Sequence, residues 1–93
     1  MKSFNIFKKA LYLYYSSYVT LNCKKEKVRW YDVYDPEEEN PEVLVKIGYE
    51  KKGYLILTCN CKHEGSKAKY NPLCAHKIAV ILQEAHEHKK HEK

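Results

Sequence analysis

The apolar pattern near the N-terminus predicts a helix over roughly residues 3–16. Apolar and aromatic side chains recur there with helical spacing, while Lys8 and Lys9 fall on the opposite face. The residues near one face are Phe4, Phe7, Leu11, Tyr14 or Tyr15, and Tyr18. Core packing is the simplest interpretation of this aromatic stripe. A platform on which bases stack is the alternative.

Alternation with a period of two predicts three antiparallel strands in the middle of the chain. They cover residues 27–34, 43–49 and 54–59. In the second strand Val43, Val45, Ile47 and Tyr49 share one face. Glu50 to Gly53 reads as a hairpin turn, since glycine adopts the positive φ that such loops need.

An acidic segment from Asp35 to Glu42, with two prolines, separates the first two predicted strands. Proline cannot continue a strand ladder, so this segment is a loop. A solvated connection is the simplest interpretation, and a contact for a basic partner is the alternative.

A second helix is predicted to begin near Ala75. Its apolar stripe consists of Ala75, Ile78, Ala79, Leu82 and Ala85, with Ile81 at its edge. The residues expected to face solvent are Lys77, Gln83, Glu84 and Glu87. We expect residues 86–93 to form a frayed polar tail.

These elements predict an α+β fold in one domain spanning residues 1–93. An N-terminal helix and turn occupy 1–26, and a three-stranded antiparallel sheet with a C-terminal helix packed on it occupies 27–93. A chain this short has a thin core, and a structural metal is a usual remedy.

The composition favours an intracellular protein, cytoplasmic or, in a eukaryote, nuclear. No apolar run approaches the roughly 20 residues of a membrane span, and Met1-Lys2 is not followed by a signal peptide. Thiols stay reduced inside cells, which favours metal binding over disulfides for the four cysteines. Neither a membrane nor a small-molecule substrate is expected as a partner.

The net charge of +5 is unevenly distributed. Residues 1–30 carry seven Lys/Arg against Glu26, residues 31–50 are strongly acidic, and residues 51–93 are basic again. The two basic segments would attract nucleic acid if folding brought them to one face.

The motif with the clearest chemistry is Cys59-x-Cys61 followed by Cys74-x-His76. Four such ligands in two pairs suit one structural Zn²⁺ ion without an open coordination position. Residues two apart in a strand point to the same side, so Cys59 and Cys61 can bind one ion. Cys74 must precede the first helical turn, because residues two apart inside a helix diverge by about 200°.

Other histidines and cysteines are weaker candidates for this site. His63 is the main competitor of His76, since it lies two residues after Cys61. The tail histidines, His86, His88 and His91, are expected to be solvated. Cys23 stands apart and reads as a small buried hydrophobe.

With these ligands named, the chain from about Val43 to Ala85 resembles the SWIM-type zinc finger family. That family carries Cys-x-Cys and Cys-x-His on a hairpin followed by a helix. The resemblance implies a zinc-binding module for DNA or protein interaction.

The expected function is therefore a non-catalytic nucleic-acid-binding module. Candidate contacts with phosphates are Lys51, Lys52, Lys62, Lys67, Lys69 and Tyr70, which would give affinity without much sequence readout. The alternative is a protein-interaction adaptor, such as an accessory subunit of a recombination or regulatory complex. We do not expect an enzyme, because a zinc ion with four protein ligands has no position for a reactive water.

Overall fold

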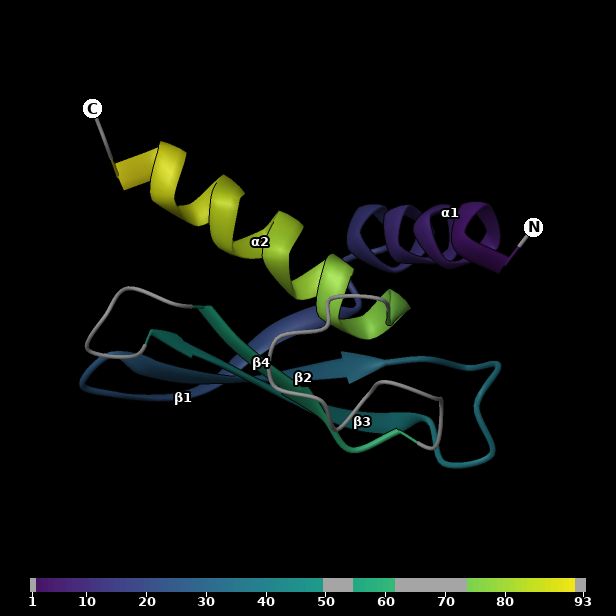
Figure 1. The fold of residues 1–93 in the computed structure, drawn as a ribbon, viewed down its shortest axis with the longest axis horizontal. Helices are drawn as coiled ribbons and strands as arrows, with labels where there is room; N and C mark the ends of the chain where they lie inside the picture. The colour runs from purple at the N-terminus through teal and green to yellow at the C-terminus, as the bar shows by residue number, and fades with distance from the viewer. Residues whose placement is uncertain (1, 50–54, 62–73, 92–93) are drawn as a thin grey trace.

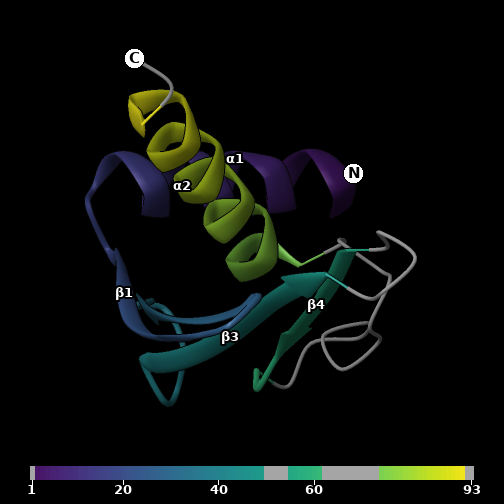
Figure 2. The ribbon, with the colours of Figure 1, turned by 90° about the vertical axis from the view of Figure 1, so that its left-hand side faces the viewer.

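The computed structural model of the chain describes residues 2–49, 55–61 and 74–91. Its elements are α1 (Lys2–Tyr15), β1 (Val19–Lys25), β2 (Val28–Tyr34), β3 (Glu42–Tyr49), β4 (Leu55–Cys59) and α2 (Ala75–His91). Both helices lie on the same face of a single sheet (Figure 1, Figure 2). The predicted α+β class is confirmed.

The sheet is an antiparallel meander of four strands in the order β1-β2-β3-β4. In such a meander the β1–β2 turn and the ends of β3 and β4 nearest residues 50–54 lie at one end of the sheet. The acidic β2–β3 loop lies at the other end. The topology therefore separates the lysines of the first turn from the acidic loop.

The prediction of three strands was wrong, because β1 was taken as part of the turn that follows the helix. Of its residues only Val19 is buried, and the register slips between Leu21 and Cys23. Asn22, at this bulge, donates from its side chain to Asp32 at 2.9 Å. An edge strand with a bulge and one buried residue lacks the regular alternation that identifies a strand.

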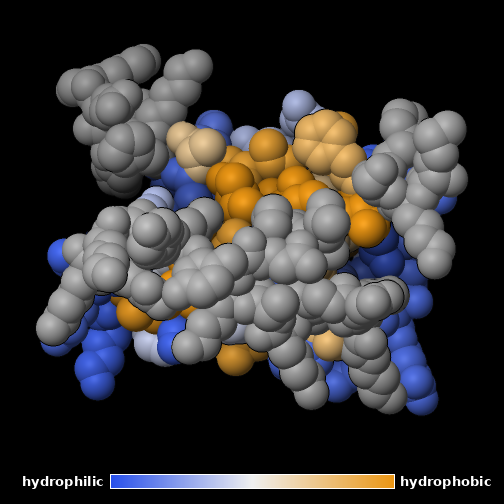
Figure 3. Space-filling model, in the orientation of Figure 1, coloured by the Kyte–Doolittle hydropathy of each residue, from blue (hydrophilic) through white to orange (hydrophobic). Residues whose placement is uncertain are grey.

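Helix α1 matches the predicted range, but it turns a different face to the core. Ala10 and Leu13 are completely buried, whereas Phe7 and Tyr15 are 51% and 76% exposed. The core face is rotated by about 100°, one residue, from the predicted stripe. Core packing is thus the wrong interpretation for Phe7 and Tyr15. Apolar side chains gather where the two helices approach each other (Figure 3).

The core lies between the sheet and α2. Val33, Val45 and Leu57 from the strands are buried with Ala79 and Val80 from the helix. The predicted inward face of the second strand is confirmed for Val43, Val45 and Ile47. Tyr49, at its end, is 51% exposed.

Helix α2 begins at Ala75, as predicted, and continues to His91 rather than fraying from His86. Lys77 is fully buried, not solvated. Glu84 is bound to the sheet, since it accepts hydrogen bonds from Arg29 and Tyr31. Ala75, His76 and Lys77 are all buried, so the first turn of α2 has no face exposed to solvent. Neither described helix has both the length and the apolar character that crossing a membrane requires.

Candidate metal centre

The two halves of the ligand motif come from a strand end and a helix start. Cys59 is the last residue of β4, Cys61 follows two residues later, and Cys74 and His76 flank the first residue of α2. All four side chains are buried. The four predicted residues are thus buried close together, and Cys59 lies on the same buried face of β4 as Leu57, as predicted.

Asn60 holds the Cys-x-Cys segment extended beyond the end of β4. Its backbone N–H donates to the Leu44 carbonyl at 3.2 Å, and its side-chain carbonyl accepts from the Leu44 N–H at 3.0 Å. This pair of bonds continues the β3–β4 ladder by one residue. Cys59 and Cys61 therefore point to the same side, as in a regular strand.

Cys74 occupies the position just before α2, where its carbonyl accepts the first helical bond from the Ile78 N–H at 3.0 Å. The backbone of Cys74 is thus outside the helix, while His76 is in its first turn. Their side chains converge, and Cys74 Sγ lies 3.6 Å from His76 Nδ1. This is the arrangement that a Cys-x-His pair needs, since residues two apart inside a helix would diverge.

Three distances between the ligand atoms match the edges of a tetrahedral site. Cys59 Sγ is 3.6 Å from His76 Nδ1, and Cys61 Sγ is 3.7 Å from Cys74 Sγ. Zinc–sulfur and zinc–nitrogen bonds of ordinary length give tetrahedral edges of about 3.8 Å between two sulfurs and about 3.5 Å between sulfur and nitrogen. The four ligand atoms lie within 4.8 Å of one another. The donor set and its geometry could hold a metal ion.

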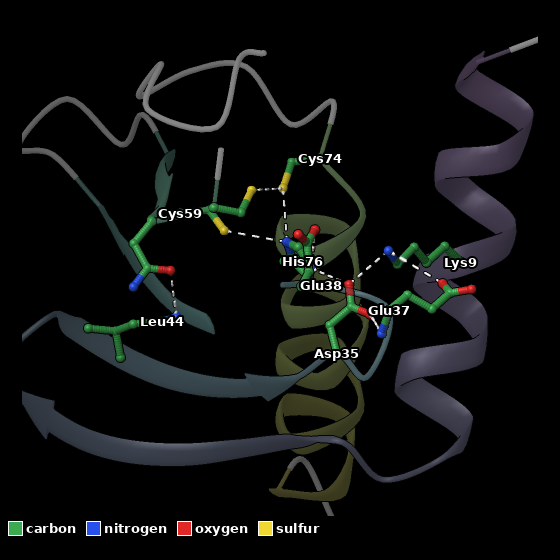
Figure 4. A network of polar contacts seen from close by, with 10 residues as sticks. Lys9, Asp35, Glu37, Glu38, Leu44, Cys59, Cys74 and His76 are labelled. Carbon is green, nitrogen blue, oxygen red and sulfur yellow. Dashed lines mark hydrogen bonds and ion pairs between the residues drawn. The ribbon is translucent and has the colours of Figure 1, made fainter. Parts of the chain in front are cut away.

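Asp35 lies on the side of the His76 ring that is opposite the cysteines (Figure 4). Its Oδ2 is 2.7 Å from His76 Nε2, and the carboxylate is fully buried. Lys9 of α1 places its Nζ 2.8 Å from the same Oδ2 and 3.4 Å from Glu37. A carboxylate behind a ligating histidine is the arrangement found at many protein metal sites.

The acidic loop is folded around Asp35. The Glu38 N–H donates to the Asp35 carbonyl at 3.1 Å, which closes a turn that has Pro36 at its second position. The Glu37 N–H donates to Asp35 Oδ1 at 3.0 Å, and the Asp35 N–H donates to the Pro41 carbonyl at 2.9 Å. The loop was interpreted as a solvated connection or as a contact for a basic partner. Neither interpretation fits Asp35, because its carboxylate is buried against His76 of the candidate metal centre.

The protonation of the centre without metal follows from these contacts. The hydrogen bond with Cys59, followed by contacts with His76 and the Lys77 N–H, lowers the pKa of Cys74 to about 3 despite burial. The same hydrogen bond and burial raise the pKa of Cys59. Burial opposes a charged imidazole, but the Cys74 thiolate and Asp35 raise the pKa of His76 to about 9.

Two lysines balance the negative charge of the centre. Lys9 is the largest influence lowering the pKa of Asp35, against the effect of burial. Lys77 is fully buried. Burial lowers the pKa of Lys77, while the three site cysteines act in the opposite direction. Lys9 is thus paired with a carboxylate of the centre, and Lys77 lies within electrostatic reach of its cysteines.

The other candidate residues are placed less favourably or lie outside the described residues. Cys23 is exposed, so its interpretation as a buried hydrophobe was wrong. His86 is exposed and meets the Tyr14 ring edge-on at 6.3 Å. The candidates outside the described residues are His63, Lys51, Lys52, Lys62, Lys67, Lys69 and Tyr70.

Three residues of the centre were missed from the sequence: Lys9, Asp35 and Lys77. In the sequence their neighbours resemble those of ordinary charged surface residues. The three residues come close to the candidate ligands only in the folded chain. The Asp35-Pro36 step was the one available signal, because aspartate before proline often begins a turn.

Comparisons of the chain with protein-family models, with curated proteins and with solved structures found no match.

Proposed function

We propose that the chain is a small, non-catalytic zinc-binding domain with one structural Zn²⁺ ion on Cys59, Cys61, Cys74 and His76. The observation that carries the proposal is the tetrahedral spacing of their buried ligand atoms, with edges of 3.6 and 3.7 Å. Three thiolates and one imidazole are a set that selects zinc among the common divalent ions. Four protein ligands complete the coordination, so the ion would act by holding the sheet to α2.

Metal content and the spectrum of a cobalt substitute test this proposal. Purified protein should contain about one zinc per chain, and Co²⁺ should give the intense visible bands of a tetrahedral thiolate-rich site. Cys61→Ser should lose both, while Cys23→Ser, which alters the exposed cysteine, should keep both. A wild-type protein that folds with no bound metal would refute the proposal.

We further propose that the domain binds nucleic acid through the basic end of the sheet. Lys24, Lys25 and Lys27 are exposed there, in and beside the β1–β2 turn. The end of β3 and the start of β4 lie at the same end of the meander, and Lys51 and Lys52, which lie outside the described residues, stand between these two strands in the sequence. The acidic loop lies at the opposite end, where Asp35 and Glu37 pair with Lys9. The resemblance to SWIM-type zinc fingers supports the same role.

Binding to short single- and double-stranded DNA at low and moderate salt tests this role. Contacts with two or three phosphates would give a slope of log K against log salt of about −2 to −3. Replacing Lys24 and Lys25 together by glutamate should reduce affinity at least tenfold. Lys8→Glu on α1, also exposed, is the charge control for the single variant Lys24→Glu, because each of these two variants changes the net charge by two units. Micromolar or weaker affinity even in low salt would eliminate the proposal.

An adaptor role is the second candidate, and the exposed aromatic side chains of α1 favour it. Phe7 and Tyr15 are 51% and 76% exposed, although aromatic residues are enriched in interfaces rather than on free surfaces. Capture of one specific partner that Phe7→Ser and Tyr15→Ser both abolish, with zinc retained, would support this role. These substitutions are preferable to deleting residues 1–20, which would remove the buried Leu13.

A further inference from the structure

A continuous chain of polar contacts runs from α1 to the metal ligands. Lys9 Nζ lies 2.8 Å from Asp35 Oδ2, and the same oxygen lies 2.7 Å from His76 Nε2. The opposite ring nitrogen, Nδ1, is 3.6 Å from both Cys59 Sγ and Cys74 Sγ. The imidazole thus stands between a carboxylate and the thiols (Figure 4).

The carboxylate determines which imidazole nitrogen can bind metal. An ionised carboxylate accepts hydrogen bonds and cannot donate one, so a neutral His76 must carry its proton on Nε2 to satisfy Asp35. Nδ1 then carries the lone pair of the ring, on the side that faces the thiols of Cys59 and Cys74. Without Asp35 the proton could occupy either nitrogen, and the ring could rotate about its Cβ–Cγ bond.

Lys9 makes the buried position of Asp35 tolerable. Asp35 is fully buried, and a carboxylate without a counter-charge in that environment would tend to protonate. Lys9 is half-buried and comes from the helix whose Ala10 and Leu13 pack in the core. The position of α1 therefore sets the position of the ammonium group.

We propose that Asp35 is a positioning residue that fixes His76 for metal binding through Nδ1, and that Lys9, acting through Asp35, couples the docking of α1 to metal affinity. The inference rests on the proposed zinc site. Linkage is reciprocal, so bound metal should also stabilise the docked position of α1. Lys9 and Asp35 would then extend the zinc clamp from the sheet and α2 to the N-terminal helix.

The first test uses the wild-type chain and therefore does not depend on any variant folding. In the zinc-loaded protein, ¹⁵N–¹H spectra of the histidine rings should show His76 metallated at Nδ1, with a slowly exchanging proton on Nε2. Metallation at Nε2 would overturn the proposal, whatever the affinity of the site.

The second test measures zinc affinity by competition with a chelator. Asp35→Asn keeps an acceptor but removes the charge, and we expect a 10- to 100-fold loss. Lys9→Met should lose several-fold. The matched controls are Asp32→Asn and Lys8→Met, since both wild-type residues are exposed, and they should bind as the wild type does.

A double variant tests whether Lys9 acts through Asp35. If it does, Lys9→Met should cost little further affinity in the Asp35→Asn background, because the two effects are not additive. Additive losses would overturn the coupling. Amide exchange in α1 should slow on zinc loading in the wild type and change less in Lys9→Met.

The outcomes separate this inference from the proposed function. A wild-type chain that binds no zinc refutes both. A wild-type chain that binds one zinc, with Asp35→Asn and Lys9→Met unchanged within twofold, refutes the positioning role and leaves the zinc domain intact.

Discussion

The charges of individual residues around His76 offset one another in part. Three thiolates and a divalent ion would leave one negative charge. Asp35 and Glu38, whose Oε1 lies 3.9 Å from His76 Nε2, add two more. Lys9, 2.8 Å from Asp35, offsets one of these charges, and the buried Lys77 can offset another. Without metal the same cluster limits its charge by keeping a proton on Cys59 and on His76, whose pKa values are both raised. Metal binding and proton release are therefore linked at these residues.

Zinc affinity should accordingly increase with pH. Below its pKa of about 9 His76 holds a proton in the metal-free fold, and zinc must displace it. Each displaced proton raises the apparent affinity by about tenfold per pH unit. Chelator competition at several pH values from about 6 to 9 would measure this slope, and a flat profile would contradict it.

The metal-free fold should show the opposite pH dependence at His76. The pKa is raised from 6.5 to about 9 on folding, so the stabilisation from protonated His76 is complete below about 6.5 and disappears as the pH rises through 9. Denaturant titration of the chelated protein at pH 6 and pH 9.5 measures the difference. His76→Gln, measured in the same way, gives the pH dependence that does not come from His76. If the difference in the free energy of unfolding between wild type and His76→Gln is the same at pH 6 and pH 9.5, this assignment is contradicted.

A single ligand substitution should reveal how much of the fold depends on the ion. Cys61→Ser leaves a hydroxyl that binds zinc poorly, and apparent binding energies for structural zinc are on the order of 10 kcal/mol. We expect zinc affinity to fall by at least about a hundredfold and the melting temperature to fall with it. Cys23→Ser should leave both unchanged, because Cys23 is exposed on β1. Thermal melts with excess zinc would check both variants.

At the scale of elements, a polar contact secures α2 to the sheet beyond the metal centre. Glu84 accepts from Arg29 at 2.8 Å and from the hydroxyl of the buried Tyr31. Burial, followed by the hydrogen bond to Glu84, raises the pKa of Tyr31. These contacts lie where α2 borders a cleft of about 940 Å³ lined by Leu21, Tyr49 and Ile81. Glu84 thus ties α2 to β2 beside this opening.

Removing that contact should destabilise the fold without affecting zinc affinity. Glu84→Ala leaves the buried hydroxyl of Tyr31 without its acceptor, which costs about 1–3 kcal/mol in the free energy of unfolding. Glu84→Gln should cost less, because the amide oxygen can still accept. Glu87→Ala, which removes the acceptor of the Gln83 side-chain hydrogen bond at 3.1 Å and leaves the Arg29 and Tyr31 contacts with Glu84 in place, is the control. Chemical denaturation of the zinc-loaded proteins would rank the three variants.

The sequence predicts an element well where its buried residues recur with a regular period. It predicts poorly where that period is interrupted or where nearly every position is apolar or aromatic. Strands β2, β3 and β4 and the start of α2 were predicted to within a residue or two because their apolar residues alternate or repeat regularly. Strand β1 was missed because it is an edge strand with a bulge at Asn22. The stripe of α1 was misassigned because nearly every position from Leu11 to Tyr15 is large and apolar or aromatic. Its partner, α2, selects the face that includes Ala10 and Leu13.

The same limit explains what was and was not predictable at the centre. The four ligands were identifiable because thiol and imidazole chemistry is specific and their spacing is local. Asp35 lies 41 residues from His76 along the chain, within a run of acidic residues that the sequence does not distinguish. Lys77 is adjacent to a ligand, but a helical wheel places it in solvent. Only tertiary packing identifies these charges.

At the scale of the whole molecule, a metal ion on the four candidate ligands would hold some parts of the fold more directly than others. β4 is a short edge strand whose end carries two ligands, and the start of α2 carries the other two. β2 and β3 lie inside the sheet and pair over seven positions. Their buried residues include Val33, Val43 and Val45. The inner strands carry no ligand and keep their pairing with each other, while their buried side chains pack against α2.

Chelation should consequently raise amide exchange unevenly along the chain. We expect β4 and the first turns of α2 to lose protection first, because their anchors are the metal ligands, while the inner pair β2–β3 keeps more of its protection. Hydrogen exchange with and without a strong chelator, read by mass spectrometry, would locate the change. Cys23→Ser treated in the same way is the control for effects on free thiols. Equal loss of protection in all strands would mean that the metal holds the whole domain together as one cooperative unit. Unchanged exchange in β4 would mean that the ligands do not bind metal in the folded chain.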